Sequence, residues 1–188
     1  AFLKNTKKGN LNRLEGYLFP DTYEFYIGDD PVRVIGKMLD NFEARFDDEL
    51  QARAKEMRMS TSEVVTLASI VERETTGSDR AVIASVFLNR LKSKKYPYLQ
   101  SCATVQYALG ERKERLSVED TKVENPYNTY LHKGLPPGPI ASPGLESIKA
   151  VLYPADTDYL FFALQEDGTH KFSETYEEHK TNNNVNPN

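Results

Sequence analysis

The sequence of 188 residues contains no tryptophan and one cysteine, Cys102. A single cysteine excludes an internal disulfide framework, and it cannot build a zinc site, because His132, His170 and His179 lack HxH or HxxxH spacing. No apolar run approaches the roughly 18 residues of a membrane span, and no signal peptide is visible. The sequence therefore predicts a globular chain without a disulfide scaffold and without a metal site.

No long run of like charges occurs in the chain, although residues 1–13 are polar and basic. The formal net charge is −4, with 24 Lys and Arg against 28 Asp and Glu, and no basic run is interleaved with aromatic residues. Nucleic acid is therefore excluded as an expected partner, and a neutral or cationic ligand fits better. Without tryptophan, any stacking on a sugar would rest on the 11 Tyr and 9 Phe.

Several motifs that carry other chemistries are also missing. The sequence has no GxSxG elbow of a serine hydrolase, and neither GxGxxG nor GxxxxGK[ST] of a phosphate-binding loop. No lysine lies in an apolar stretch suited to a pyridoxal-phosphate Schiff base, so no cofactor is expected. What remains is carboxylate chemistry with amide and hydroxyl groups around it, a pattern that suits cleavage of a glycosidic bond.

The carboxylates in question lie on a helix predicted from Ser60 to Gly77. Ser60 and Glu63 form a capping box at its start, and Gly77 lies where a helix commonly ends. Apolar residues cover well over half of its circumference, so the helix should be largely buried. These residues are Val64, Val65, Leu67, Ala68, Ile70 and Val71.

Glu72 and Glu74 fall on opposite edges of the apolar arc of this helix. In one interpretation they are rim residues, solvated or paired with lysines. In the other, one of them is a general acid held in an apolar setting. Glu72 is the better candidate, because Ala68 and Ser69 one turn back leave room for a substrate, whereas Glu74 stands over the bulky Ile70.

The other elements predict an α+β fold, mainly helical with a short β-hairpin. A helix is expected after Asp30, with Pro31 at its first position, and another after Ser142, with Pro143 at its first position. Residues 159–164 and 169–173 read as strands joined by the Asp167-Gly168 turn. The remaining helices are expected at 48–57, 81–93, 104–109 and 175–180.

Residues 125–144 form a stretch of twenty residues with five prolines and three glycines. Flexible linkers are poor in large side chains, but this stretch contains Tyr127, Tyr130 and Ile140. We expect a stiff loop that walls a binding groove and keeps water from it.

Six sequence blocks, taken together and in order, resemble the YceG-like, or MltG, endolytic lytic transglycosylases of bacterial peptidoglycan. They are LEGYLFPDTYEF, LASIVERET, VFLNRL, LQSCATVQYALG, NPYNTYLHKGLPPGPIASPG and GTHKFSETYEEH. The resemblance runs from about residue 14 to residue 180, which implies a catalytic domain at 14–180, a remnant of an upstream region at 1–13 and a polar tail at 181–188. Cys102 departs from the pattern, since many members have aspartate there.

The resemblance implies cleavage of the bond between N-acetylmuramic acid (MurNAc) and N-acetylglucosamine (GlcNAc) in glycan strands, with formation of 1,6-anhydroMurNAc ends. Glu72 would act first as acid and then as base. The residues expected to bind substrate are Gln100, Tyr127, Asn128, Thr129, Tyr130, Ile140 and Ser142. A hydrolytic muramidase and a non-catalytic glycan-binding or scaffold module remain as alternatives.

The resemblance also implies a place for the whole protein in the cell. It would be a single-pass membrane protein acting on the extracytoplasmic face, with penicillin-binding synthases as partners. The membrane would be reached only through an anchor absent from this sequence.

Overall fold

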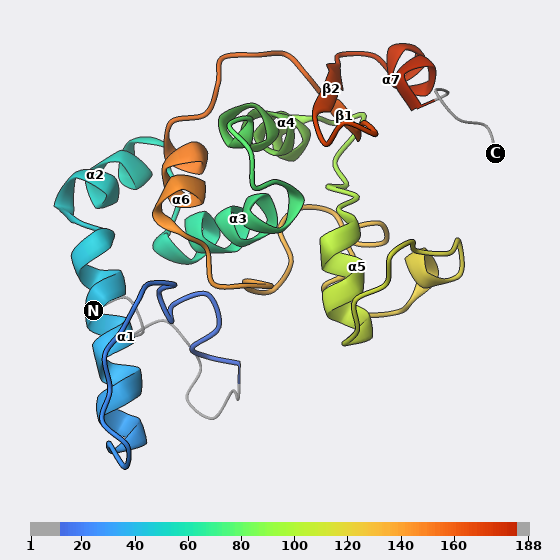
Figure 1. The fold of residues 1–188 in the computed structure, drawn as a ribbon. Coiled ribbons are helices and arrows are strands. Elements are labelled where there is room, and N and C mark those ends of the chain that lie inside the picture. The colour runs from blue at the N-terminus through green and yellow to red at the C-terminus, as the bar shows by residue number, and fades with distance from the viewer. Residues whose placement is uncertain (1–11, 184–188) are drawn as a thin grey trace.

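A computed structural model of the chain describes residues 12–183 (Figure 1). The expectations for residues 1–11 and 184–188 lie outside the described residues. The helices are α1 (Pro31–Arg45), α2 (Asp48–Glu56), α3 (Thr61–Glu74), α4 (Arg80–Lys92), α5 (Cys102–Leu109), the short 3-10 helix η2 (Asp120–Lys122), α6 (Leu145–Leu152) and α7 (Tyr176–Asn183). Strands β1 (Phe161–Leu164) and β2 (His170–Ser173) form an antiparallel pair. The predicted α+β fold, mainly helical with a short hairpin, is confirmed.

Helix α3 begins as the sequence predicts but ends earlier. The Ser60 hydroxyl accepts from the Glu63 amide at 3.2 Å, and the Glu63 carboxylate accepts from the Ser60 amide at 2.8 Å, so both halves of the capping box are present. The last helical residue is Glu74, because Thr75 adopts an extended backbone conformation with φ −148° and ψ 147°. Glu74 therefore lies at the very end of the helix, where its neighbours come from other segments.

The centre of the molecule is built by α3, α4 and α6, which pack against one another (Figure 1). All six apolar residues predicted to be buried on α3 have no exposed surface. Burying a side chain such as Leu67 or Ile70 contributes about 1.5–3 kcal/mol of hydrophobic free energy. Because α3 is packed on its neighbours along most of its length, the position of its C-terminal end is fixed.

Helix α6 begins two residues later than the sequence predicts. Gly144 is its N-cap residue and Leu145 its first helical residue, so Pro143 lies before the helix and Ser142 does not cap it. The acceptor for the donors at its start is Glu72 of α3, from a distant part of the chain.

The proline-rich segment 125–144 packs on the body of the protein and contains no regular helix or strand. The Ile140 amide donates to the Ser69 hydroxyl of α3 at 3.0 Å, and Ile140 is buried. Pro139 lies so close to Gly16 that a Cβ atom added there would approach it to 2.5 Å. The second half of the segment is therefore a packed layer over α3 and the chain near Gly16.

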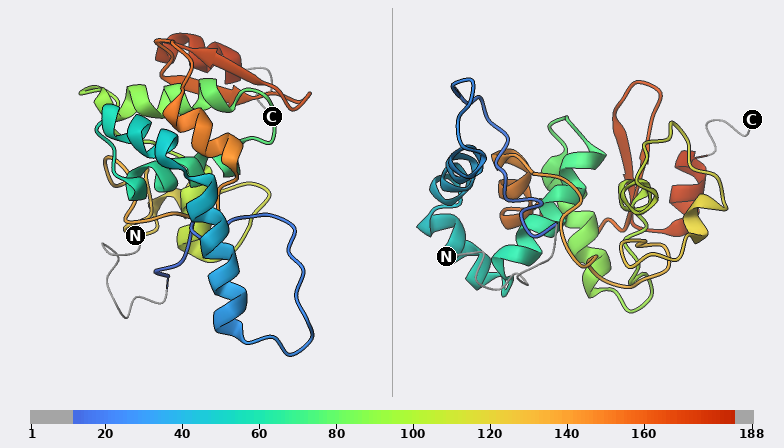
Figure 2. Two further views of the ribbon diagram at one scale, coloured as in Figure 1. Left: turned by 90° about the vertical axis from the view of Figure 1, so that its left-hand side faces the viewer. Right: turned by 90° about the horizontal axis from the view of Figure 1, so that it is seen from below.

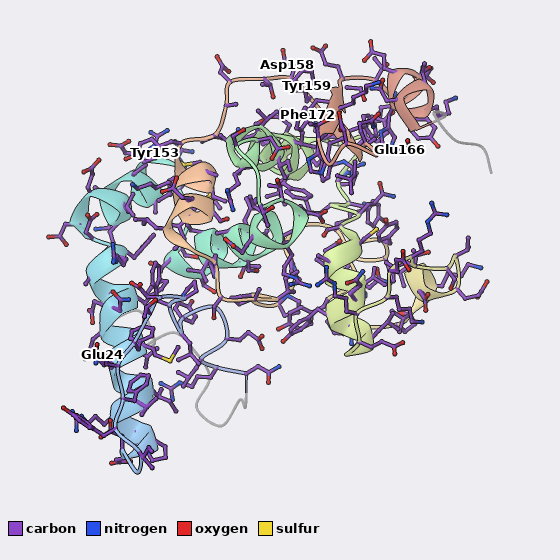
Figure 3. The ribbon with its side chains drawn as sticks, in the orientation of Figure 1. Glu24, Tyr153, Asp158, Tyr159, Glu166 and Phe172 are labelled. Carbon is purple, nitrogen blue, oxygen red and sulfur yellow. The ribbon has the colours of Figure 1, made fainter. Side chains whose placement is uncertain are left out.

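The hairpin and α7 lie at the opposite end of the molecule from α1, as two orthogonal views show (Figures 1 and 2). In the hairpin Phe161 pairs with Ser173 and Leu164 with His170. The rings of Tyr159 and Phe172, labelled in Figure 3, stack at a centroid distance of 5.7 Å. This stacking holds the segment before β1 against β2, and the hairpin forms one side of a pocket.

Candidate active site

A pocket of about 520 Å³ lies between the ends of α3 and α4, the start of α5, the hairpin and α7. It collects one carboxylate, one guanidinium, two imidazoles and a group of aromatic rings. The lining residues that bear on function are Glu74, Arg90, Gln100, Tyr130, Phe161 and His170. This combination of an acid, hydrogen-bonding groups and flat apolar rings suits a carbohydrate ligand.

Glu74 contributes the carboxylate of the pocket. Its side chain is half-buried, and one of its oxygens, Oε1, accepts a hydrogen bond from the Ser101 hydroxyl. Burial raises the pKa of Glu74 above its ordinary value, against the opposing effects of the Ser101 hydrogen bond and of the charges of His170 and Arg73. A carboxyl group that keeps its proton to higher pH in a pocket is suited to act as a general acid.

Glu72, the acid predicted from the sequence, has a different environment. Its Oε2 atom accepts from the Gly144 amide at 3.1 Å and from the Ser147 hydroxyl at 2.6 Å, at the first turn of α6. Glu72 does not line the pocket. A carboxylate at a helix N-terminus satisfies free amides and complements the helix dipole, so Glu72 acts here as the cap of α6.

Gln100, one of the residues expected to bind substrate, lines the pocket and has a strained backbone. Its φ of +53° falls in the left-handed region, which side chains other than glycine enter at a cost of about 1–3 kcal/mol. The conformation is held from two sides: the Gln100 amide donates to Thr129 O at 3.2 Å, and Arg90 Nη2 donates to Gln100 Oε1 at 2.9 Å. Gln100 is an exposed residue of the pocket lining, so its side-chain Nε2 can face a ligand.

Asn128 and Thr129 are buried supports, not part of the pocket lining. Asn128 Nδ2 donates to Thr121 O and Val123 O at 3.0 and 2.9 Å, and Asn128 Oδ1 accepts from the Tyr130 amide at 3.0 Å. These bonds occupy the amide of Asn128 within the protein.

Thr129 supports the acid indirectly. Its hydroxyl accepts from the Ser101 amide at 3.1 Å and contacts the Thr104 hydroxyl at 2.8 Å. Since Ser101 donates to Glu74, this network holds the hydroxyl that orients the acid.

Tyr130 is the residue of the proline-rich segment that reaches the pocket. Its hydroxyl lies 3.3 Å from Cys102 Sγ, and burial raises its pKa, so it is a neutral hydrogen-bonding group at pH 7. Tyr127 packs instead on Tyr107, with ring centroids 4.7 Å apart.

The remaining predicted residues of this segment, Ile140 and Ser142, do not line the pocket, and neither do the prolines at 136, 137 and 139. The geometry therefore does not favour the expectation that the prolines wall the site.

Two further polar groups of the pocket were not assigned a role from the sequence. His170 Nδ1 lies 2.7 Å from Asp79 Oδ2, and Asp79 Oδ1 accepts from the Thr75 hydroxyl at 2.7 Å. Burial works against ionisation of Asp79, but the hydrogen bonds from Thr75 and His170 outweigh it and lower its pKa. The second group is Arg90. One feature of the sequence indicates a special role for it, because Asn89 and Arg90 interrupt an otherwise apolar helix.

The mainly helical fold carries a pocket with one acid, hydrogen-bonding groups and aromatic rings, and similarity to known proteins identifies the family to which the chain belongs. The model of the YceG-like family matches residues 2–185, and the chain belongs to this family. A crystal structure of a YceG-like protein from Listeria monocytogenes superposes with a TM-score of 0.85 at 41% identity, covering 93% of this chain and 57% of that one.

Relatives from two bacterial species have the name endolytic murein transglycosylase. The one from Bacillus subtilis is 42% identical over 180 residues, 95% of this chain and 48% of the relative. The one from Streptococcus pneumoniae strain D39 is 34% identical over 184 residues, 93% of this chain and 32% of the relative. The chain thus spans about half and about a third of their lengths.

None of the helices in residues 12–183 has both the length and the apolar character of a membrane span.

Proposed function

We propose that the chain is the catalytic part of an endolytic murein lytic transglycosylase, with Glu74 as its acid and base. The substrate is the glycan strand of peptidoglycan, and the bond cleaved is that between MurNAc and GlcNAc. The names of the relatives support the reaction class, and the pocket supports the assignment of the acid. The membrane anchor and the penicillin-binding synthases implied by the family resemblance stay predictions for the whole protein.

The observation that carries the proposal is the contrast between the two glutamates at the end of α3. Glu74 lines the pocket, and burial raises its pKa. Glu72 is engaged in capping α6 through Gly144 and Ser147. Glu74 therefore replaces Glu72 as the proposed acid, because a proton donor must reach the leaving oxygen of a bound substrate.

The reaction needs one carboxyl group and no water. Protonated Glu74 gives its proton to the glycosidic oxygen, and the bond between the muramic acid C1 and this oxygen breaks as an oxocarbenium-like centre develops. The Glu74 carboxylate then takes the proton of the C6 hydroxyl of the same sugar. O6 bonds to C1, which gives the 1,6-anhydro ring and returns Glu74 to its protonated form.

The surrounding groups have separate roles in this scheme. The Ser101 hydroxyl orients one oxygen of Glu74 and stabilises the carboxylate that forms after proton transfer. The Gln100 amide and the Tyr130 hydroxyl are placed to bind N-acetyl or hydroxyl groups of the sugar. Tyr176, whose exposed ring also lines the pocket, offers a face on which a sugar can stack.

The test is digestion of purified peptidoglycan, followed by mass spectrometry of the muropeptides. We expect products with anhydro ends, lighter by one water than hydrolysed ends, and their release should be slower by about 10²–10⁴-fold with Glu74→Gln. Hydrolysed ends alone would indicate a muramidase, and an absence of products from the unaltered protein would indicate a non-catalytic module. Either result would contradict the proposal.

A further inference from the structure

Arg90 is a buried cation on the pocket wall that has no carboxylate partner in residues 12–183. The residue is 7% exposed. Its Nη1 donates to Leu99 O at 2.8 Å and its Nη2 to Gln100 Oε1 at 2.9 Å, and both acceptors are uncharged. Its Nε is buried and has no hydrogen-bond partner among the described residues. Of the five N–H donors of the guanidinium, two are therefore satisfied by the protein.

The groups around Arg90 do not neutralise its charge. The guanidinium lies over the Phe161 ring at 5.1 Å, a cation–π contact that offsets part of the cost of burial. Burial raises the pKa of Tyr130, and burial together with the Arg90 charge lowers the pKa of His179, so both are neutral at pH 7. Glu74 is the one acid among the described lining residues, and it must be protonated to begin the reaction.

A charge taken out of water without a counter-charge is costly, and burial correspondingly lowers the pKa of Arg90. Holding Leu99 and Gln100 in place would explain two of its hydrogen bonds. It does not explain a charged group there, since a neutral amide could donate the same bonds. The free donors and the uncompensated charge point to an anion that arrives with the ligand.

We propose that Arg90 forms a subsite for a carboxylate of the substrate, beside the rings of Phe161 and Tyr176. The planar fork of a guanidinium binds a carboxylate with charge-assisted hydrogen bonds. The inference rests on the proposed function for the identity of the substrate. In a murein strand such a carboxylate is either the lactyl group of a peptide-free muramic acid or a carboxylate of the stem peptide.

Binding to the Glu74→Gln variant, measured by calorimetry or NMR, tests this subsite without turnover. One pair of probes is N-acetylmuramic acid and its lactyl amide. The other is N-acetylmuramoyl-L-alanyl-D-glutamate and its fully amidated form. A hydrogen-bonded charge pair at Arg90 should make the acid bind roughly tenfold or more tightly than the amide. A preference in the first pair identifies the lactyl group as the source, and a preference in the second pair alone identifies the stem.

Adding Arg90→Gln should remove the preference, and adding Arg90→Lys, which keeps the charge without the fork, should reduce it. Gln100→Ala is the matched control, because it removes the same hydrogen bond to Nη2 but keeps the guanidinium, and the preference should survive. Should Arg90→Gln fail to fold, the lysine variant carries the test. Equal or undetectable binding of acid and amide in both pairs would overturn the inference, and so would a preference unaffected by the Arg90 variants. Since binding is measured without cleavage, this result can fail while the proposed function stands.

Discussion

The two sides of the α3 C-terminal end differ in what they contact, although one helix turn carries both. On one side Glu74 faces a pocket, and its hydrogen bond comes from Ser101, the residue before α5. On the other side Glu72 meets the first turn of α6, and Ser69 meets the proline-rich segment. We call these the pocket side and the packing side of α3.

The comparison shows that an acidic residue at the edge of a buried helix can have either of two uses. On the packing side the carboxylate is an acceptor for amide and hydroxyl donors and holds two helices together. On the pocket side burial favours the protonated form, which is useful for proton transfer. Variants of the pocket side should therefore change the reaction, and variants of the packing side should change stability.

The largest effect is expected from Glu74→Gln. The amide has nearly the same shape but cannot give a proton to the leaving oxygen, so the rate of strand cleavage should fall by about 10²–10⁴-fold. Glu72→Gln is the matched control and should retain most of the activity, because its amide oxygen still accepts from the first turn of α6. Rates of release of soluble muropeptides measure both. The reverse ranking would reassign the acid to Glu72.

A smaller effect, on stability, is expected from Gly16→Ala on the packing side. Gly16 has φ +83°, and an added Cβ would lie 2.6 Å from Pro139 Cβ and 2.8 Å from Val65 Cγ1. Overpacking at such a site costs about 1–3 kcal/mol of unfolding free energy. Chemical denaturation measures the loss, while the ratio of anhydro to hydrolysed ends should stay unchanged. A changed product ratio without a stability loss would restore a role for the prolines in excluding water.

Glu72→Ala should have the next largest effect on stability. It leaves the Gly144 amide and the buried Ser147 hydroxyl without their acceptor, at a cost of about 1–2 kcal/mol, which is typical of a lost helix cap. Thermal or denaturant unfolding measures this. A stability equal to that of the unaltered protein would mean that the cap contributes nothing, and the packing side would then need another explanation.

Much of the fold was predictable because its signals are local. The capping box at Ser60, Pro31 after Asp30 and the Asp167-Gly168 turn each act on the residues next to them, and each predicted its element. The early end of α3 was missed because the extended backbone of Thr75 has no local signature in the sequence.

The site was less predictable because its geometry depends on distant segments. Helical periodicity placed Glu72 and Glu74 on opposite edges of the apolar arc, but it could not show that α6 covers one edge. The motif residue Asn128 was expected to bind substrate, yet its amide binds the carbonyls of Thr121 and Val123. Gln100 and Tyr130 do line the pocket, and their contacts with substrate stay predictions.

The central claim is that the proton of Glu74 drives cleavage, and a titration in the same protein tests it most directly. The Glu74 carboxyl carbon is followed by NMR between pH 3 and 9, and kcat/KM for strand cleavage is measured over the same range. Because burial raises the pKa of Glu74, its midpoint should lie above the ordinary glutamate value of 4.5, and the rate should fall as pH rises through this midpoint. Ser101→Ala removes the hydrogen bond that opposes this shift, so it should move both the midpoint and the fall in rate to higher pH. A Glu74 midpoint at or below 4.5, or a rate profile that does not follow it, would contradict the account.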